Sequence, residues 1–84
     1  MLAEIVIGNM EAIFNCSGDD KLIYVYYINI RTNKEFTLNF NDQSAANKYM
    51  FEFIRSHFKK NTNVFARTQI GKTCRDISHL VWKN

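Results

Sequence analysis

The chain has 84 residues, of which 46% are hydrophobic and 14% aromatic, a composition typical of a folded domain rather than a disordered segment. No run approaches the roughly 18 apolar residues that a membrane-spanning helix needs, and the N-terminus lacks the basic and apolar regions of a signal peptide. Two cysteines, Cys16 and Cys74, are too few for a disulfide framework, so we expect two reduced thiols. The sequence therefore predicts one domain, residues 1–84, located in the cytoplasm and not associated with a membrane.

Apolar side chains occupy even positions in three segments between residues 10 and 40. Because side chains in a strand alternate between the two faces of a sheet, one parity kept through three segments predicts one buried sheet face. Loops at residues 17–19 and 32–34 would join the segments into an antiparallel meander, with Phe14 opposite Leu22. The expected buried face comprises Met10, Ala12, Phe14, Leu22, Tyr24, Tyr26, Ile28, Ile30, Phe36, Leu38 and Phe40.

The first strand changes phase once along its length. Ile5 and Ile7 occupy odd positions, whereas Ala12 and Phe14 occupy even ones. A β-bulge at residues 8–9 would return both pairs to one face, and glycine is the residue that a bulge tolerates best.

After residue 40 the apolar period lengthens to three and four residues, which predicts an amphipathic helix of about four turns. Asp42 is a favourable N-cap, and the helix is expected to end near residues 60–61 and to cover the even face of the sheet. Tyr26, at mid-sheet, and Phe53, at mid-stripe, are the expected core residues.

The C-terminal segment begins with alternating apolar residues at 64–70, which predict a fourth strand ending at Gly71. Residues 73–76 then read as a capping box that opens a short helix, and a fifth strand at residues 77–82 is the competing interpretation. The predicted fold is α+β: an antiparallel three- or four-stranded meander, one long amphipathic helix on one face, and a short C-terminal helix or strand.

Charge is distributed unevenly, with a net charge of −3 over residues 1–47 and +6 over residues 48–84. Such an asymmetry indicates a surface for nucleic acid or an acidic partner, although a solvated face that keeps a small protein soluble is the simpler alternative. Phe51, Phe65 and Trp82 are the first candidates for stacking on bases. The predicted binding residues are Lys48, Arg55, Lys59, Lys60, Arg67, Lys72 and Arg75.

The odd face of the predicted sheet is too apolar for an ordinary solvated face. In the register above, Ile13 pairs with Ile23, and Val25 and Tyr27 lie beside them. Either the C-terminal segment or another chain is expected to cover these four side chains. They are the predicted self-association residues, and a homodimer is the expected assembly.

Motifs with catalytic or ligand chemistry are weak in this chain. Residues 66–73 match a permissive phosphate-binding loop, but Ala66 replaces the first glycine and eleven residues remain after the match, so a turn is the better interpretation. His57 and His79 could act as an acid–base pair, yet nothing in the sequence orients either imidazole. Cys74 and the two histidines lack a zinc-ligand spacing, so neither a metal nor a cofactor is expected.

Asn, Lys, Ile, Phe and Tyr make up 37 of the 84 residues, and proline is absent. These amino acids are encoded by AT-rich codons. In size and composition the chain resembles the small host-takeover and counter-defence proteins of T-even-type bacteriophages, which include inhibitors of toxin nucleases and of CRISPR effectors.

The resemblance implies a non-enzymatic protein that binds a protein partner in the host cytoplasm and inhibits or regulates a host factor, such as a defence nuclease or toxin. The basic C-terminal half adds RNA association to this expectation. The alternatives are a small RNase-like enzyme that uses His57 and His79, and a purely structural homo-oligomer.

Overall fold

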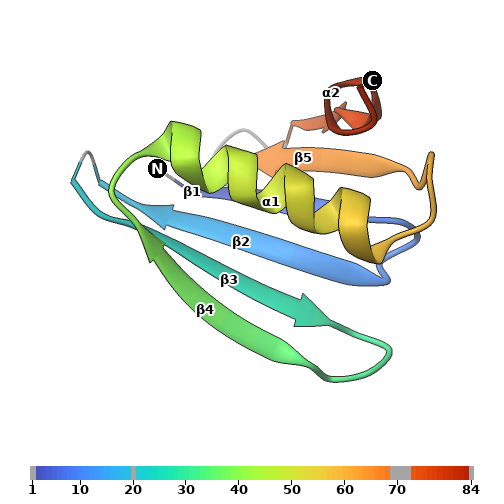
Figure 1. The fold of residues 1–84 in the computed structure, drawn as a ribbon, viewed down its shortest axis with the longest axis horizontal. Coiled ribbons are helices and arrows are strands. Elements are labelled where there is room, and N and C mark those ends of the chain that lie inside the picture. The colour runs from blue at the N-terminus through green and yellow to red at the C-terminus, as the bar shows by residue number, and fades with distance from the viewer. Residues whose placement is uncertain (1, 20, 69–72, 84) are drawn as a thin grey trace.

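The computed structural model describes residues 2–19, 21–68 and 73–83, in which antiparallel strands form one open sheet and a long helix crosses one of its faces (Figure 1). The strands are β1 (Leu2–Ile7), β2 (Ala12–Gly18), β3 (Ile23–Asn29), β4 (Glu35–Phe40), β5 (Val64–Thr68) and β6 (Cys74–Asp76). The helices are α1 (Gln43–His57) and α2 (Ser78–Val81). The strand order is β4-β3-β2-β1-β5-β6, and the predicted α+β class is confirmed.

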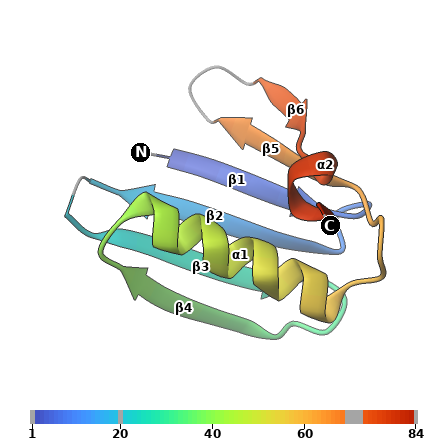
Figure 2. The same ribbon diagram turned by 45° about the horizontal axis from the view of Figure 1, so that its top comes forward.

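β2, β3 and β4 form the meander that the sequence predicted; β1 is a further antiparallel strand beside β2, and β5 and β6 extend the sheet beyond it. α1 connects β4 at one edge to β5 near the other, and α2 packs against α1 and β5 (Figure 2). The fourth predicted strand is present as β5. No helix in the described residues is both long enough and apolar enough to cross a membrane.

The predicted C-terminal helix is present as α2, but residues 74–76 form a strand, so the expected start at residue 73 is wrong, as is the competing strand at residues 77–82. Pairing with β5 supplies backbone partners for this segment. The helix begins only at Ser78, whose N–H donates to Asp76 Oδ1 at 2.8 Å. The carboxylate of Asp76, which was expected in the first turn of the helix, therefore precedes the helix.

A turn, and not the predicted bulge, separates the two apolar phases of the N-terminal segment. β1 and β2 pair antiparallel, so that Ile5 lies opposite Phe14 and Ile7 lies opposite Ala12. Gly8 has φ +63° and its N–H donates to the carbonyl of Asn63 at 2.7 Å. Glycine adopts this left-handed conformation at little cost, and the turn reverses the chain so that both phases face α1.

The register between β2 and β3 differs from the predicted one, because Phe14 lies opposite Tyr27 instead of Leu22. β2 continues through the expected loop to Gly18, and the side chain of Asp19 then accepts the N–H groups of Lys21 and Leu22 at 2.8 and 3.1 Å. This turn shifts β3 by an odd number of residues, which exchanges its two faces.

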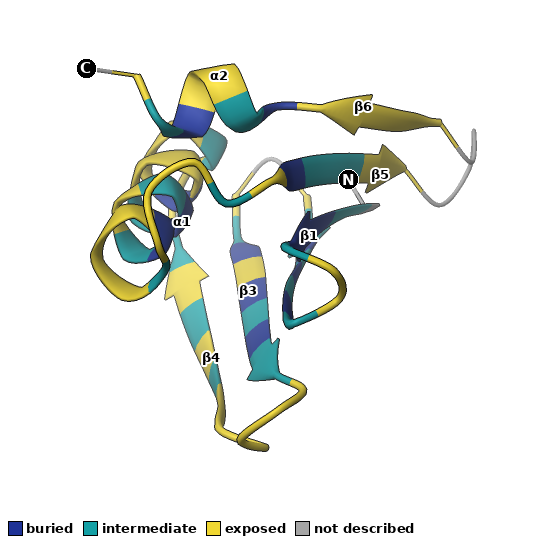
Figure 3. Cartoon of the chain, turned by 90° about the vertical axis from the view of Figure 1, so that its right-hand side faces the viewer, coloured by how far each residue is buried: buried dark blue, intermediate teal, exposed yellow. Residues whose placement is uncertain are grey.

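The predicted self-association surface is therefore wrong. Ile23, Val25 and Tyr27 face α1 and are at most 4% exposed, whereas Ile13 lies on the other side of the sheet. Figure 3 shows the resulting alternation of buried and exposed bands along β3. Three of the four residues expected to bind a second copy are instead part of the hydrophobic core.

The face of the sheet opposite α1, here called the open face, carries a row of apolar side chains. The register aligns Phe65, Val6, Ile13 and Ile28 across four strands. Tyr26, predicted to be core, is half-buried on this face and donates its hydroxyl to Glu35 Oε2 at 2.9 Å. The even positions of β3 are thus the solvent-facing ones.

α1 begins as predicted, with Asp42 Oδ1 accepting the N–H of Ala45 at 2.8 Å, and it ends at His57, earlier than expected. Its buried residues are Ala46, Met50 and Ile54. Phe53 is half-buried and packs edge-on against the fully buried ring of Phe14, with ring centroids 5.5 Å apart. The contact attaches the helix to the middle of the sheet.

Phe14→Ala should lower the free energy of unfolding by about 3–5 kcal/mol, because it removes a fully buried ring and leaves a cavity. Tyr24→Ala is the matched control, since Tyr24 lies on the open face and is 44% exposed. It should cost less than about 1 kcal/mol. Urea unfolding of both variants measures the difference, and equal costs would contradict the placement of α1 over Phe14.

Candidate functional site

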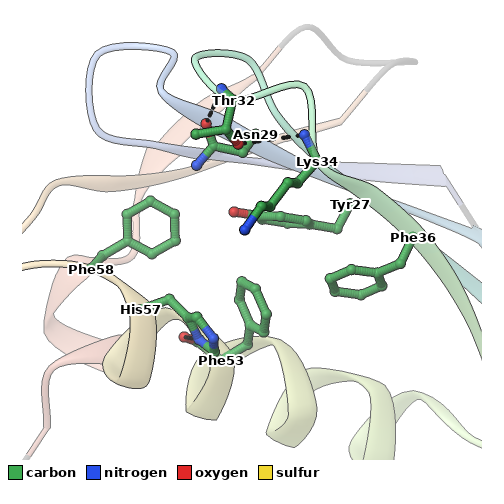
Figure 4. Close-up of a pocket in the computed structure, with 8 residues that line it drawn as sticks. All are labelled: Tyr27, Asn29, Thr32, Lys34, Phe36, Phe53, His57 and Phe58. Atoms are coloured by element: carbon green, nitrogen blue, oxygen red, sulfur yellow. Dashed lines mark hydrogen bonds between the residues drawn. The ribbon is translucent and has the colours of Figure 1, made fainter.

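A cleft of about 370 Å³ lies between the C-terminal end of α1 and the hairpin that joins β3 to β4 (Figure 4). Its volume falls at the lower end of the range that small-molecule sites occupy. Four aromatic rings line it together with polar side chains of the hairpin and the helix, and we call it the aromatic cleft. The lining residues are Tyr27, Asn29, Thr32, Lys34, Phe36, Phe53, His57 and Phe58.

The helical wall of the cleft is a stacked pair of rings. Phe53 and His57 lie one turn apart on α1, and their ring centroids are 4.0 Å apart with an angle of 14° between the planes. His57 Nδ1 lies 3.0 Å from the backbone carbonyl oxygen of Phe53. Because a carbonyl oxygen only accepts, this hydrogen bond places a proton on Nδ1 and leaves Nε2 for a ligand.

The sheet wall of the cleft is continuous with the hydrophobic core. Tyr27 stacks on Phe36 with ring centroids 5.0 Å apart, and the Phe53 ring meets Tyr27 at 4.7 Å. Burial raises the pKa of the Tyr27 hydroxyl, a hydrogen bond from the Asn29 side chain opposes that rise, and the charge of Glu11 adds to it. The hydroxyl therefore stays protonated at neutral pH and offers both a donor and an acceptor.

The polar rim of the cleft comes from an ordered hairpin loop. Asn29 Oδ1 accepts the N–H groups of Arg31 and Thr32 at 3.0 and 3.1 Å, which is the geometry of an Asx turn. The Thr32 hydroxyl in turn accepts the N–H of Lys34 at 3.4 Å. The loop thus holds the Lys34 side chain over the cleft, as Figure 4 shows. The cleft therefore suits a ligand that has a flat ring, polar groups at the edge of the ring and a negative charge nearby.

The basic residues predicted from the sequence do not form a single surface. Lys48, Arg55, Lys59 and Lys60 are exposed on α1 and on the segment that follows it. Arg55 also donates from Nη1 to the carbonyl oxygen of Val81 at 2.9 Å, so it links α1 to α2. Glu52 is the only acidic residue within α1. The helical side of the molecule is therefore cationic.

Two of the other three predicted basic residues lie elsewhere in the described part of the chain. Arg67 projects on the open face, where it forms an ion pair with Glu4. Arg75 lines a second groove of about 270 Å³ between α1, α2 and the sheet. Lys72 lies outside the described residues.

The two histidines of the catalytic alternative occupy different elements. His57 lines the aromatic cleft, whereas His79 is an exposed residue of α2 and is not among the residues that line it. Cys16 and Cys74 are free, the first buried and the second exposed. Within the described ranges, no three His, Cys, Asp or Glu side chains gather where they could hold a metal ion.

Most of the residues that line the cleft were not predicted from the sequence. The stacking candidates named there lie elsewhere: Phe51 lines the second groove, Phe65 lies on the open face, and Trp82 Nε1 donates to the Thr62 carbonyl oxygen at 2.7 Å. The one available signal was Phe58, an aromatic residue followed directly by two lysines at the end of the predicted helix.

Comparison of the chain with protein-family models, with curated proteins and with solved structures finds no match.

Proposed function

We propose that the protein is a non-enzymatic binding protein that takes single-stranded RNA at the aromatic cleft. One base enters the cleft, and the phosphates on either side meet Lys34, Lys59 and Lys60. The observation that carries this proposal is the cleft itself, which Lys34 and Phe58 line, with Lys59 and Lys60 directly after Phe58 in the chain.

Stacking supplies the first part of the interaction. Proteins that bind single strands stack bases on aromatic side chains, at about 1–3 kcal/mol per base. Phe58 is half-buried and packs against the core, and its backbone N–H donates to the carbonyl of Ile54 at 3.0 Å. The Tyr27 hydroxyl and the remaining N–H of the Asn29 amide, whose oxygen accepts the hairpin N–H groups, can donate to the edge of the base.

Charge supplies the second part and selects the side of approach. Lys59 and Lys60 follow Phe58 directly and are exposed. The open face instead carries Glu35 and the Glu4–Arg67 ion pair, so it lacks the excess of positive charge that attracts a polyanion. RNA therefore meets the helical side of the molecule.

The predicted regulation of a host factor forms part of this proposal. A protein that holds RNA without cleaving it regulates a host factor either by sequestering that RNA or by carrying it to a protein partner. The rival class, an RNase-like enzyme, would use His57, whose Nε2 is available within the cleft. Incubation with labelled RNA distinguishes the two classes. A binding protein leaves the RNA intact, whereas an enzyme shortens it. If His57 is catalytic, the His57→Gln variant should no longer shorten the RNA.

Affinity for labelled single-stranded RNA should fall steeply with salt, with a slope in log K against log salt of about −0.7 for each phosphate contacted. Lys59→Glu should make this slope shallower by about that amount and weaken binding alike for all sequences. Lys21→Glu reverses the charge of another exposed lysine, on the loop between β2 and β3, and should change little. Fluorescence anisotropy at several salt concentrations measures the slope, and no binding at low salt would refute the RNA proposal.

Phe58→Ala should weaken RNA binding by roughly 5- to 150-fold, which corresponds to the loss of one stacked base. Phe58→Trp should restore binding, because it keeps a ring in the cleft. Phe51→Ala is the matched control: Phe51 is also half-buried and packs against the core, but it lines the second groove. If both alanine variants lose equal affinity, the loss reflects stability and the cleft is not the site.

A further inference from the structure

The two edges of the sheet are built differently. β6 has three residues, and two of them, Arg75 and Asp76, are charged. Short, charged strands are the devices with which proteins prevent pairing at a sheet edge. β4 has six residues with Glu35 as its one charge, and the chain contains no proline. In Figures 1 and 2 no described helix or loop runs along the outer side of β4.

The backbone of β4 presents its polar groups to this edge. The N–H of Asn29 donates to the carbonyl of Lys34 at 2.9 Å, and hydrogen-bonded pairs alternate along an antiparallel ladder. The even-numbered residues of β4 therefore bond to β3, and the odd-numbered ones direct their N–H and C=O groups outward. These outward residues are all exposed: Glu35, Thr37 and Asn39.

The side chains of β4 on the helical face are apolar and incompletely covered. Phe36, Leu38 and Phe40 are all half-buried, and β4 reaches no fully buried position. The Tyr49 ring packs over Phe36 and Phe40 at 6.3 and 5.5 Å, whereas Leu38 between them is not among the side chains that pack against the core cluster. Leu38 lies opposite the buried Val25 of β3 and is thus a half-buried apolar side chain at an open edge.

We propose that β4 pairs antiparallel with β4 of a second copy of this chain, with Leu38 on the twofold axis. In this register Phe36 faces Phe40 of the second copy, so rings meet rings across the axis. An axis at Thr37 would place Phe36 opposite Leu38 and lose this ring pairing. The two sheets become one continuous sheet with both α1 helices on the same side, because paired residues share a face. This interface does not depend on RNA binding.

The first test compares oligomeric states by light scattering at protein concentrations from about 5 to 200 µM, a range in which small interfaces of this kind associate. The wild-type protein should be a dimer at the upper end. Leu38→Lys should raise the dimer dissociation constant by about a hundredfold, because two like charges meet on the axis and two apolar contacts are lost. Leu38→Met keeps an apolar side chain of similar volume and should remain dimeric.

Mixing variants tests the register directly. Leu38→Lys and Leu38→Glu should each be monomeric alone, whereas an equimolar mixture should form a heterodimer because opposite charges then meet on the axis. A wild-type protein that is monomeric at 200 µM would overturn the proposal and leave β4 for a strand of a different protein. A dimer that survives Leu38→Lys unchanged would also overturn it, because another surface must then hold the copies together.

Cross-linking gives an independent reading that does not require weakening the interface. In a Cys74→Ser background, Leu38→Cys should form a disulfide across the axis on mild oxidation, since directly opposed residues in an antiparallel pair lie within disulfide range. Thr37→Cys is the matched control, because Thr37 faces Asn39 of the second copy in the proposed register. Cross-linking of the Thr37 variant, or of neither variant, refutes the Leu38 axis.

Discussion

The packing of Phe14 against rings from both layers is the interaction on which the rest of the structure depends. Phe14 is fully buried on β2, and its ring centroid lies 4.8 Å from that of Tyr27 and 5.5 Å from that of Phe53. These contacts set α1 over the middle of the sheet and carry its C-terminal end to the β3–β4 hairpin. The floor of the aromatic cleft is thus the edge of the core, so core packing orders its walls. The same arrangement means that Tyr27 and Phe53 cannot be changed without loss of stability, so a functional test rests on Phe58 and Lys59.

A single long helix over a wide sheet leaves surfaces of different character. The helical side is cationic through Lys48, Lys59 and Lys60, whereas the open face combines an apolar row with the carboxylates of Glu4 and Glu35. The helical side thus carries the excess of positive charge, because Arg67 offsets Glu4 on the open face. The β4 edge lies between these two sides. Pairing there would place apolar side chains of the second copy beside Phe36, which forms part of the cleft wall.

Sequence reasoning identified those features that depend on residues close together in the chain. The N-cap at Asp42 and the apolar residues spaced at three and four positions determine α1, because both signals act within one or two helical turns. The strand segments and the α+β class follow from local alternation in the same way. The C-terminal helix was placed too early, because Asp76 serves equally well as a first-turn carboxylate and as the acceptor that precedes Ser78. Boundaries of this kind depend on which backbone groups find partners in β5.

The sequence by itself determined that three strands between residues 10 and 40 are apolar and that a helix covers them, but only the tertiary structure decided which face it covers. β3 is apolar at both parities, so Val25 and Tyr26 were equally good core residues until the turn at Asp19 shifted the strand by an odd number of positions. The aromatic cleft likewise joins residues as far apart as Tyr27 and Phe58, which no local pattern connects. Register and long-range contacts are chosen by turn geometry and by the packing of whole elements, and these are decided only when the chain is folded.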